Sequence, residues 1–285
     1  MRLLTYPKYI VLFQLGKPPA WGCAIYMETI VAFKIPKLEE LASRIILALD
    51  HESWKEAWLD AQLWKKLGGV WVKVNPIHLV AVGYHIIQDL RKIGLKVFVD
   101  PKYFNTEKVL GRTAAAACKY GLDMLNCGAS SGVKAMRAFA AECASNESDR
   151  LSIAVTVLTT IDDEECRETY NGRTALEQVM VFAKQAARAG MSGIVCSGLE
   201  LPSLKSDPQT KNLITVVPGI RDGLDSAGDQ SRIVTPFRGF AAGADYEVIG
   251  SSLYNRDLGD GTKSRDLGRN WKMIRDNYVV EKEAA

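Results

Sequence analysis

Eight short apolar runs, each followed by a stretch of helical periodicity, constrain the fold of this chain more than any other feature. Their apolar residues are continuous and rich in β-branched types, which is typical of parallel strands covered by helices. The runs are "RIILALD" ending at Asp50, "GVWVKVN" at Asn75, "KVFVD" at Asp100, "DMLNCG" at Gly128, "LSIAVTVL" at Leu158, "SGIVCSG" at Gly198, "NLITVVPG" at Gly219 and "DYEVIGS" at Ser251.

The helical stretches between these runs, such as "HLVAVGYHIIQDLRKIG", support the same architecture. Several end in a glycine that suits a left-handed C-terminal cap, namely Gly68, Gly94, Gly121 and Gly190. Eight consecutive βα units predict an α/β fold, a (β/α)8 TIM barrel. A doubly wound open sheet is the alternative, but "ALDHES" stands after the first run, where such a sheet would carry the phosphate-binding GxGxxG.

The length of 285 residues suits one barrel domain, over residues 44–285, preceded by an N-terminal extension over residues 1–43. The extension contains the apolar stretch "YIVLFQLGKPPAWGCAIYMETIVAFKI". Lys17, Pro18 and Pro19 divide this stretch into pieces shorter than a membrane span. We therefore expect no membrane partner.

Charge and cysteine content narrow the class of partner. The 36 Lys and Arg against 33 Asp and Glu leave a net charge of +3, and both signs are spread along the chain, so we expect no nucleic-acid partner. Only three histidines are present, which makes a zinc site or a Ser-His-Asp triad hard to build. The cysteines are widely spaced without a CxxC motif and indicate buried thiols in a reducing, cytoplasmic setting: Cys23, Cys118, Cys127, Cys143, Cys166 and Cys196.

Polar residues recur where the apolar runs stop, which is where barrel enzymes place their sites. Asp50 alone could instead cap the helix that follows it. Lys73 is harder to dismiss, because a charge within a buried strand is costly unless it is paired. The full set is Asp50, Lys73, Asp100, Lys102, Thr159, Thr160 and Arg221.

Asp100 and Lys102 are two positions apart and would project to the same side of a continuing strand. With Lys73 on the neighbouring strand, they would form a row of alternating charges. In such a row the carboxylate can repel an anionic substrate group, while an ammonium stabilises and protonates a developing carbanion. The alternative is an ion-pair network that only satisfies the barrel mouth.

An anion site is expected at the far end of the chain. "VVPGIRDG" offers a glycine turn and Arg221, and "ADYEVIGSS" ends in Gly250 and two hydroxyl residues, in the region where barrels bind phosphate. The alternative is an ordinary loop around Pro218 and Gly219. Two such loops in the last two units favour phosphate.

From about Arg44 to about Asn255, the chain resembles the bacterial-type orotidine 5'-monophosphate decarboxylase family. The resemblance implies a (β/α)8 barrel that forms a homodimer with sites at the interface. It also implies decarboxylation of orotidylate to uridylate in pyrimidine biosynthesis without metal or organic cofactor. The segments that carry it are "ILALD", "VKV", "KVFVDPK", "TVLTTID", "VCSGLEL", "VVPGIR", "AGDQSRIVTP" and "GADYEVIG".

The resemblance also implies roles for individual residues. Lys102 would protonate the carbanion, Asp100 would face the substrate carboxylate, and Lys73 would complete the charge network. Asp50 would meet the ribose, and the loop "RDGLDSAGDQ" would act as a lid. The remaining substrate contacts would come from Thr159 or Thr160 at the pyrimidine and from Arg221, Gln230, Gly250 and Ser251 around the phosphate.

Several positions depart from the family pattern. Asn105 stands where the family motif DxKxxD has an Asp that reaches the partner's site, so the network loses one negative charge. Ser251 replaces a phosphate-binding Arg, Gly128 replaces a His, and Asn75 replaces a Gly. Two alternatives stay open: a repurposed or weakened barrel that binds a nucleotide, and a metal-dependent sugar-phosphate decarboxylase of the same superfamily, against which Asn105 argues.

Overall fold

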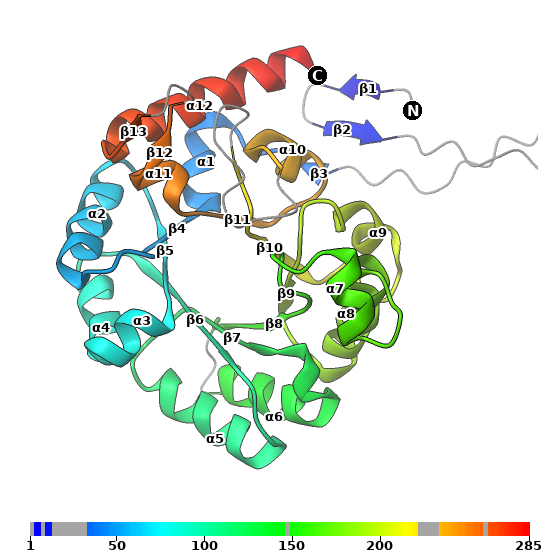
Figure 1. Ribbon diagram of the computed structural model, residues 1–285. Helices are drawn as coiled ribbons and strands as arrows, with labels where there is room; N and C mark the ends of the chain where they lie inside the picture. Colours follow the sequence, from blue (N-terminus) through cyan, green and yellow to red (C-terminus); the bar gives the residue numbers. More distant parts are fainter. Residues whose placement is uncertain (1–2, 7–8, 13–32, 146–148, 222–233, 259–261) are drawn as a thin grey trace, which may run out of the picture.

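The computed structural model of the chain describes residues 3–6, 9–12, 33–145, 149–221, 234–258 and 262–285. Eight parallel strands close into a barrel in the order β10-β11-β4-β5-β6-β7-β8-β9 (Figure 1). They are β4 (Ile45–Ala48), β5 (Trp71–Val74), β6 (Lys96–Tyr103), β7 (Met124–Gly128), β8 (Leu151–Val155), β9 (Gly193–Val195), β10 (Ile214–Val217) and β11 (Tyr246–Ile249).

All eight predicted strands are confirmed, and so is the closed barrel. Closure is decided by the pairing of β11 with β4, in which Val248 lies opposite Ile46. An open doubly wound sheet has two edge strands that each lack one neighbour, whereas each of these eight strands pairs on both sides, so that alternative is excluded.

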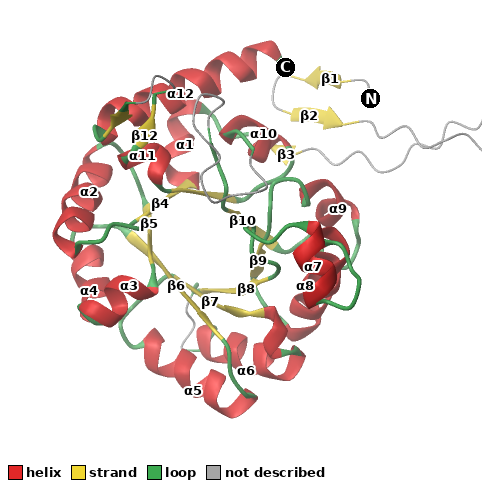
Figure 2. Ribbon diagram, in the orientation of Figure 1, coloured by secondary structure: helices red, strands yellow, loops and turns green. Residues whose placement is uncertain are grey.

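Helices lie outside the ring of strands (Figure 2). They are α1 (Leu38–Arg44), α2 (Trp54–Lys66), α3 (Pro76–Ala81), α4 (His85–Lys92), α5 (Glu107–Cys118), α6 (Val133–Cys143), α7 (Asp163–Thr169), α8 (Ala175–Ala189), α9 (Leu201–Ser206), α10 (Pro236–Ala241), α11 (Ser251–Tyr254) and α12 (Leu267–Ala284), with a 3-10 turn η1 (Ala129–Ser131).

Burial on both faces explains the continuous apolar runs. One face of each strand packs against the helices in the main core, and the other face points into the barrel. A second cluster fills the barrel interior, formed by Ile46, Ala48, Trp71, Phe98, Met124, Ile153, Val216 and Val248. The interior is therefore a packed layer of side chains that forms the floor of the barrel mouth.

Glycines end or divide helices as their backbone freedom allows. The predicted caps at Gly68, Gly94, Gly121 and Gly190 are confirmed, with φ between +77° and +90°. Gly83, at φ +107°, divides one predicted helical stretch into α3 and α4. A residue with a side chain rarely adopts this conformation, so the helix ends there.

Helix α7 was not predicted, because its sequence "DEECRET" has no apolar stripe. Only Cys166 is buried on it. Its start is instead determined locally, since the Asp162 side chain accepts hydrogen bonds from the backbone N–H groups of Glu164 and Glu165 at 2.9 Å each. This is an ordinary N-cap.

The N-terminal residues that the structure describes form a separate antiparallel sheet of β1 (Leu3–Tyr6), β2 (Tyr9–Leu12) and β3 (Phe33–Lys34). Two short strands, β12 (Arg256–Asp257) and β13 (Lys263–Ser264), pair before α12. No helix in the described ranges is long and apolar enough to cross a membrane. The boundary at residue 43 stays a prediction.

The predicted buried thiols are confirmed for the five cysteines that the structure describes. All five are buried and free of disulfides: Cys118, Cys127, Cys143, Cys166 and Cys196. Cys23 lies outside the described residues.

Candidate active site

A cavity of about 520 Å³ opens at the carboxyl ends of the barrel strands. Its lining includes nine of the eleven residues expected at the site, brought together from β5, β6 and the segments after β4, β8, β10 and β11. These nine are Asp50, Lys73, Asp100, Lys102, Thr159, Thr160, Arg221, Gly250 and Ser251.

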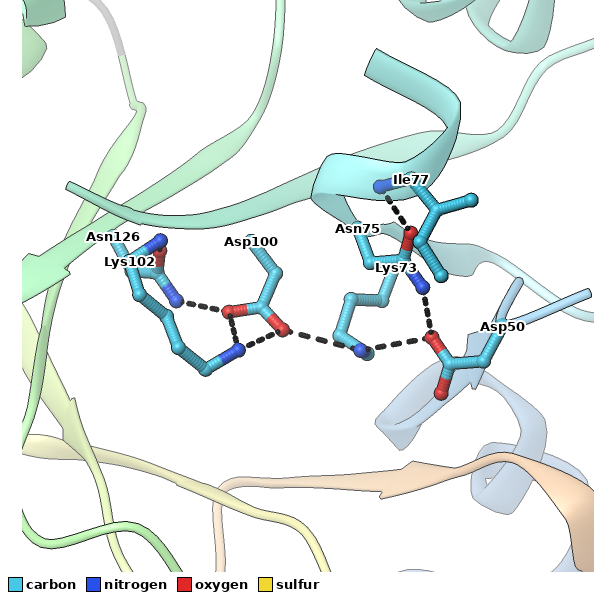
Figure 3. A network of polar contacts seen from close by, with 7 residues as sticks. All are labelled: Asp50, Lys73, Asn75, Ile77, Asp100, Lys102 and Asn126. Carbon is cyan, nitrogen blue, oxygen red and sulfur yellow. Dashed lines mark hydrogen bonds and ion pairs between the residues drawn. The ribbon is translucent and has the colours of Figure 1, made fainter. Parts of the chain in front are cut away.

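The predicted row of alternating charges is present along one side of this cavity (Figure 3). Lys73 Nζ lies 3.1 Å from Asp50 Oδ1 and 3.1 Å from Asp100 Oδ2. Lys102 Nζ lies 2.9 Å and 2.8 Å from the two oxygens of Asp100. Two carboxylates and two ammonium groups therefore alternate in sign along contacts of hydrogen-bond length.

Parallel pairing places Lys73 between its two acids. In β5, Lys73 lies opposite Ala48 of β4 and Phe98 of β6, so the carboxyl ends of both neighbouring strands lie beside it. Burial by itself lowers the pKa of Lys73, but the charges of Asp100 and Asp50 outweigh burial and raise the pKa above its usual value. The lysine is therefore charged at neutral pH.

Asp100 is held as a carboxylate by the same contacts. Burial raises its pKa, while the charges of Lys73 and Lys102 lower it more strongly, so the pKa ends below its usual value. The side chain is 7% exposed, in contrast to 43% for Lys102. The cavity thus presents a fixed buried anion beside a lysine that can reach a bound ligand.

The backbone at Lys102 is unusual. Its φ is +50°, a left-handed value that is uncommon for a residue with a side chain. The pairing of β6 with β7 shifts register between Val99 and Tyr103, so β6 is bulged at this point. The expectation that Asp100 and Lys102 would meet is confirmed, but the strand is not regular there.

Two asparagines donate hydrogen bonds to the carboxylates of the row. Neither was predicted to have a role in the site. Asn126 of β7 donates its amide N–H to Asp100 Oδ1 and accepts the backbone N–H of Lys102 at 2.8 Å. Asn75 donates to Asp50 Oδ1 at 2.8 Å and accepts the N–H of Ile77 at 2.9 Å, which caps α3. Asn126 could have been identified from the sequence, because it is a polar residue inside the buried run "DMLNCG".

The expected anion-binding groups line the same cavity, next to the Asp50 end of the charged row. The Arg221 guanidinium donates to Ser252 Oγ at 3.3 Å, beside Gly250 and Ser251 at the start of α11. Tyr254 of α11 also lines the cavity and stacks on His51, with 4.1 Å between ring centroids. Neither ring is among the residues predicted for the site.

Asn105 does not line the cavity of its own chain. It is exposed, and its Oδ1 accepts the backbone N–H of Thr106 at 2.8 Å, next to the start of α5. A role in a partner's site stays a prediction. Gln230 and the proposed lid, except Arg221, lie outside the described residues.

No group of three or more His, Cys, Asp or Glu side chains in the described ranges is arranged to hold a metal ion. The carboxylates of the cavity are instead paired with lysines. A barrel of parallel strands with convergent charged groups at their carboxyl ends is the architecture of a (β/α)8-barrel enzyme.

Comparisons with known proteins define the family. The family model described as "Orotidine 5'-phosphate decarboxylase / HUMPS family" matches residues 43–263. Orotidine 5'-phosphate decarboxylase of Pseudoalteromonas translucida is 35% identical over 76% of this chain and 93% of that protein. The protein of the same name from Idiomarina loihiensis is 36% identical over 74% of this chain and 90% of its own length. This chain belongs to the orotidine 5'-phosphate decarboxylase / HUMPS family.

Solved structures with a similar fold include a member of the same family. The crystal structure of orotidine 5'-phosphate decarboxylase from Lactobacillus acidophilus matches with a TM-score of 0.64 and 25% identity, over 83% of this chain and 99% of that one. The structure of an uncharacterized conserved protein from Geobacillus kaustophilus matches with a TM-score of 0.65 and 26% identity, over 82% and 99% of the two chains.

Proposed function

We propose that this chain decarboxylates orotidine 5'-monophosphate to uridine 5'-monophosphate, a step of pyrimidine biosynthesis. The observation that carries the proposal is the row Asp50, Lys73, Asp100 and Lys102 in a cavity at the barrel mouth. Family membership and the names of the relatives support it. The chemistry needs no cofactor, because a fixed anion and a nearby proton donor suffice.

In the proposed reaction, the bond between the pyrimidine ring and its carboxylate breaks and carbon dioxide leaves. The electron pair stays on the ring carbon and takes a proton from Lys102 Nζ. Lys102 suits this role, because its ammonium is partly exposed to the cavity and is held by both oxygens of Asp100. An ammonium at this position stabilises the developing negative charge before it gives up its proton.

Asp100 would act on the substrate carboxylate through like-charge repulsion. Because Lys73 and Lys102 keep it ionised, a substrate carboxylate bound nearby faces a fixed negative charge. That repulsion disappears when neutral carbon dioxide forms, so it favours the transition state over the bound substrate. Lys73 would keep Asp100 in place, and Asp50, at the other end of the row, would bind the ribose hydroxyls.

The phosphate would bind at the Arg221 side of the cavity. Arg221, the Gly250 backbone and Ser251, which line the cavity, would supply a cation, an N–H and a hydroxyl there, and Thr159 or Thr160 would contact the pyrimidine. Binding energy from this remote group can hold the substrate carboxylate against Asp100. Gln230 and closure of the lid remain parts of the proposal.

We propose that the protein is a cytoplasmic homodimer, and that the surface around the barrel mouth forms the dimer interface. Ile77 and Val80 of α3, Phe104 after β6 and Val109 of α5 are exposed by 55%, 87%, 67% and 44%. Large apolar side chains grouped beside a site often mark an interface. A partner packed there would bring its Asn105 toward this cavity.

The test is the fall in orotidylate absorbance after addition of purified protein in the presence of EDTA. We expect turnover by the wild-type chain and a loss of roughly 100-fold or more in Lys102→Ala, because the proton donor is removed. Turnover of a keto-sugar phosphate that stops with EDTA would instead support the metal-dependent alternative.

One observation favours a second candidate, a weakened barrel that binds a nucleotide without efficient turnover. Ser251 lies at the proposed phosphate end of the cavity, where the family pattern has an arginine. Tight binding of uridylate with no loss of orotidylate would select this candidate. A titration by calorimetry on the same sample separates the two.

A further inference from the structure

We propose that Asn126 is a positioning residue that holds Asp100 and Lys102 in their reactive arrangement. The inference rests on the proposed function, because it assigns Asn126 a part in the same reaction. Asn126 touches neither the cavity nor a ligand-facing surface: it is completely buried in β7 and does not line the cavity. It would act through its two neighbours.

One amide contacts both groups. Its N–H donates to Asp100 Oδ1 (Figure 3). Its oxygen accepts the backbone N–H of Lys102 at 2.8 Å. A single rigid side chain therefore determines the distance between the carboxylate and the backbone from which the lysine extends. A change in the position of Asn126 displaces both groups together.

The bulge of β6 explains why an extra side chain is needed. Val99 pairs with Leu125 and Tyr103 pairs with Cys127, so residues 100–102 of β6 lie opposite Asn126 alone. Pro101, at the centre of this bulge, has no N–H to donate to β7. The side chain of Asn126 replaces the lost backbone pairing and receives the Lys102 N–H.

The same bond supports the left-handed backbone of Lys102. A residue with a side chain stays at φ +50° only where its surroundings hold it there. With the Asn126 oxygen removed, Lys102 can relax toward an ordinary conformation, and its Nζ would move away from Asp100. Such relaxation requires no change in the barrel itself.

A neutral amide suits the electrostatics of the row. Asp100 already accepts contacts from Lys73 and Lys102, and the Asn126 N–H adds a donor without adding charge. A carboxylate in its place would repel Asp100, and one of the two acids would bind a proton over an extended pH range. The balance of two anions and two cations thus depends on an uncharged residue.

The first experiment compares Asn126→Ala with wild-type protein in orotidylate turnover. We expect kcat to fall roughly 100-fold, as displacement of a reacting group by about an ångström does, with KM changed by less than about threefold. Thr215→Val is the matched control. Thr215 is equally buried and donates to Gly243 O at 3.1 Å, but it faces the amino-terminal end of the barrel and does not line the cavity. It should keep the wild-type kcat.

The isosteric variant Asn126→Asp tests the inference even if Asn126→Ala fails to fold. It keeps an acceptor for the Lys102 N–H, so the fold should persist, as circular dichroism over the pH range would check. Protonated at low pH, the introduced acid can still donate to Asp100. The ratio of variant to wild-type turnover should therefore fall as pH rises from about 5 to about 8, because the introduced acid loses its proton over this range and then repels Asp100. If Asn126 had only a structural role, the pH dependence of turnover would be the same in Asn126→Asp and in the wild type.

A second measurement does not depend on turnover. Trace labelling with an amine-reactive ester, read by peptide mass spectrometry, should increase at Lys102 in Asn126→Ala relative to the exposed Lys55 of α2. Unchanged labelling together with wild-type kcat would overturn the inference. Increased labelling in a chain whose wild-type form does not turn over orotidylate would uphold the positioning role and reject the proposed function.

Discussion

Lys102 Nζ contacts both carboxylate oxygens of Asp100, at 2.9 Å and 2.8 Å, from a position only two residues away on the same bulged strand. A regular strand would place the two side chains on one face, but the left-handed Lys102 brings the ammonium back across the carboxylate. The proposed proton donor and the proposed repelling anion therefore form one unit, and a substrate must bind against both at once.

Restoring the missing acid at position 105 is the first prediction. Asn105→Asp should raise orotidylate turnover or leave it unchanged, because it adds a negative charge that, across the proposed dimer interface, can support Lys102 of the partner subunit. Stopped-flow or absorbance assays at equal dimer concentration would measure it. The gain should vanish in the double variant with Lys102→Ala, and a clear loss of turnover would contradict the proposed interface role.

A cation at the phosphate end should strengthen substrate binding. In Ser251→Arg, the added guanidinium can pair with a phosphate beside Arg221, and we expect KM for orotidylate to fall by roughly tenfold. Orotidine, which lacks the phosphate, provides the comparison and should show no such change. An equal effect on both compounds would place the phosphate elsewhere.

Glu247 provides a test of stability. It belongs to β11, its side chain is completely buried against Gly239 of α10, and burial raises its pKa well above the usual 4.5. A raised pKa in the folded state means that stability is fully present below pH 4.5 and is lost as pH rises through the folded-state pKa. Glu247→Gln lacks this loss and should be more stable than wild type at pH 8, by roughly 1–3 kcal/mol.

Urea unfolding at pH 5 and at pH 8 would measure the effect, and the advantage of Glu247→Gln should be larger at the higher pH. Glu56→Gln on the exposed face of α2 is the control and should show little difference at either pH. If the advantage of Glu247→Gln is the same at both values, the buried carboxyl does not titrate in this range.

The apolar patch at the barrel mouth predicts the oligomeric state. Phe104→Glu places a charge where the proposed interface buries a phenyl ring, so we expect the dimer to dissociate and turnover to fall with it. Light scattering after size exclusion would report the mass. Leu176→Glu, on the exposed surface of α8, should leave the mass unchanged. A monomeric wild-type protein would contradict the prediction.

Much of this protein could be predicted from local patterns. The eight strands were identified because burial on both faces makes a parallel barrel strand continuously apolar. Lys73 was identified because a charge within such a run needs partners, and the carboxyl ends of the adjacent strands supply Asp50 and Asp100. In these cases a short stretch of sequence carries the physical reason within itself.

Other features depend on residues that are distant in the sequence. In the sequence, Asn126 is one polar residue within a buried run. The residues around it in the sequence do not indicate that it lies opposite the bulge of β6. Glu247 likewise reads as part of a strand, although its burial depends on the packing of α10. The split at Gly83 and helix α7 were missed because they lack a periodic apolar signal.

The sequence by itself therefore determined the barrel and the set of charged groups at its mouth, because hydrophobic periodicity and strand ends are local properties. Only the tertiary structure decided how those groups are held: the register that places one amide against three residues of the next strand, the left-handed backbone of Lys102, and the contacts that set the pKa values of Lys73 and Asp100. These depend on strand pairing and on desolvation, which exist only once the barrel has closed.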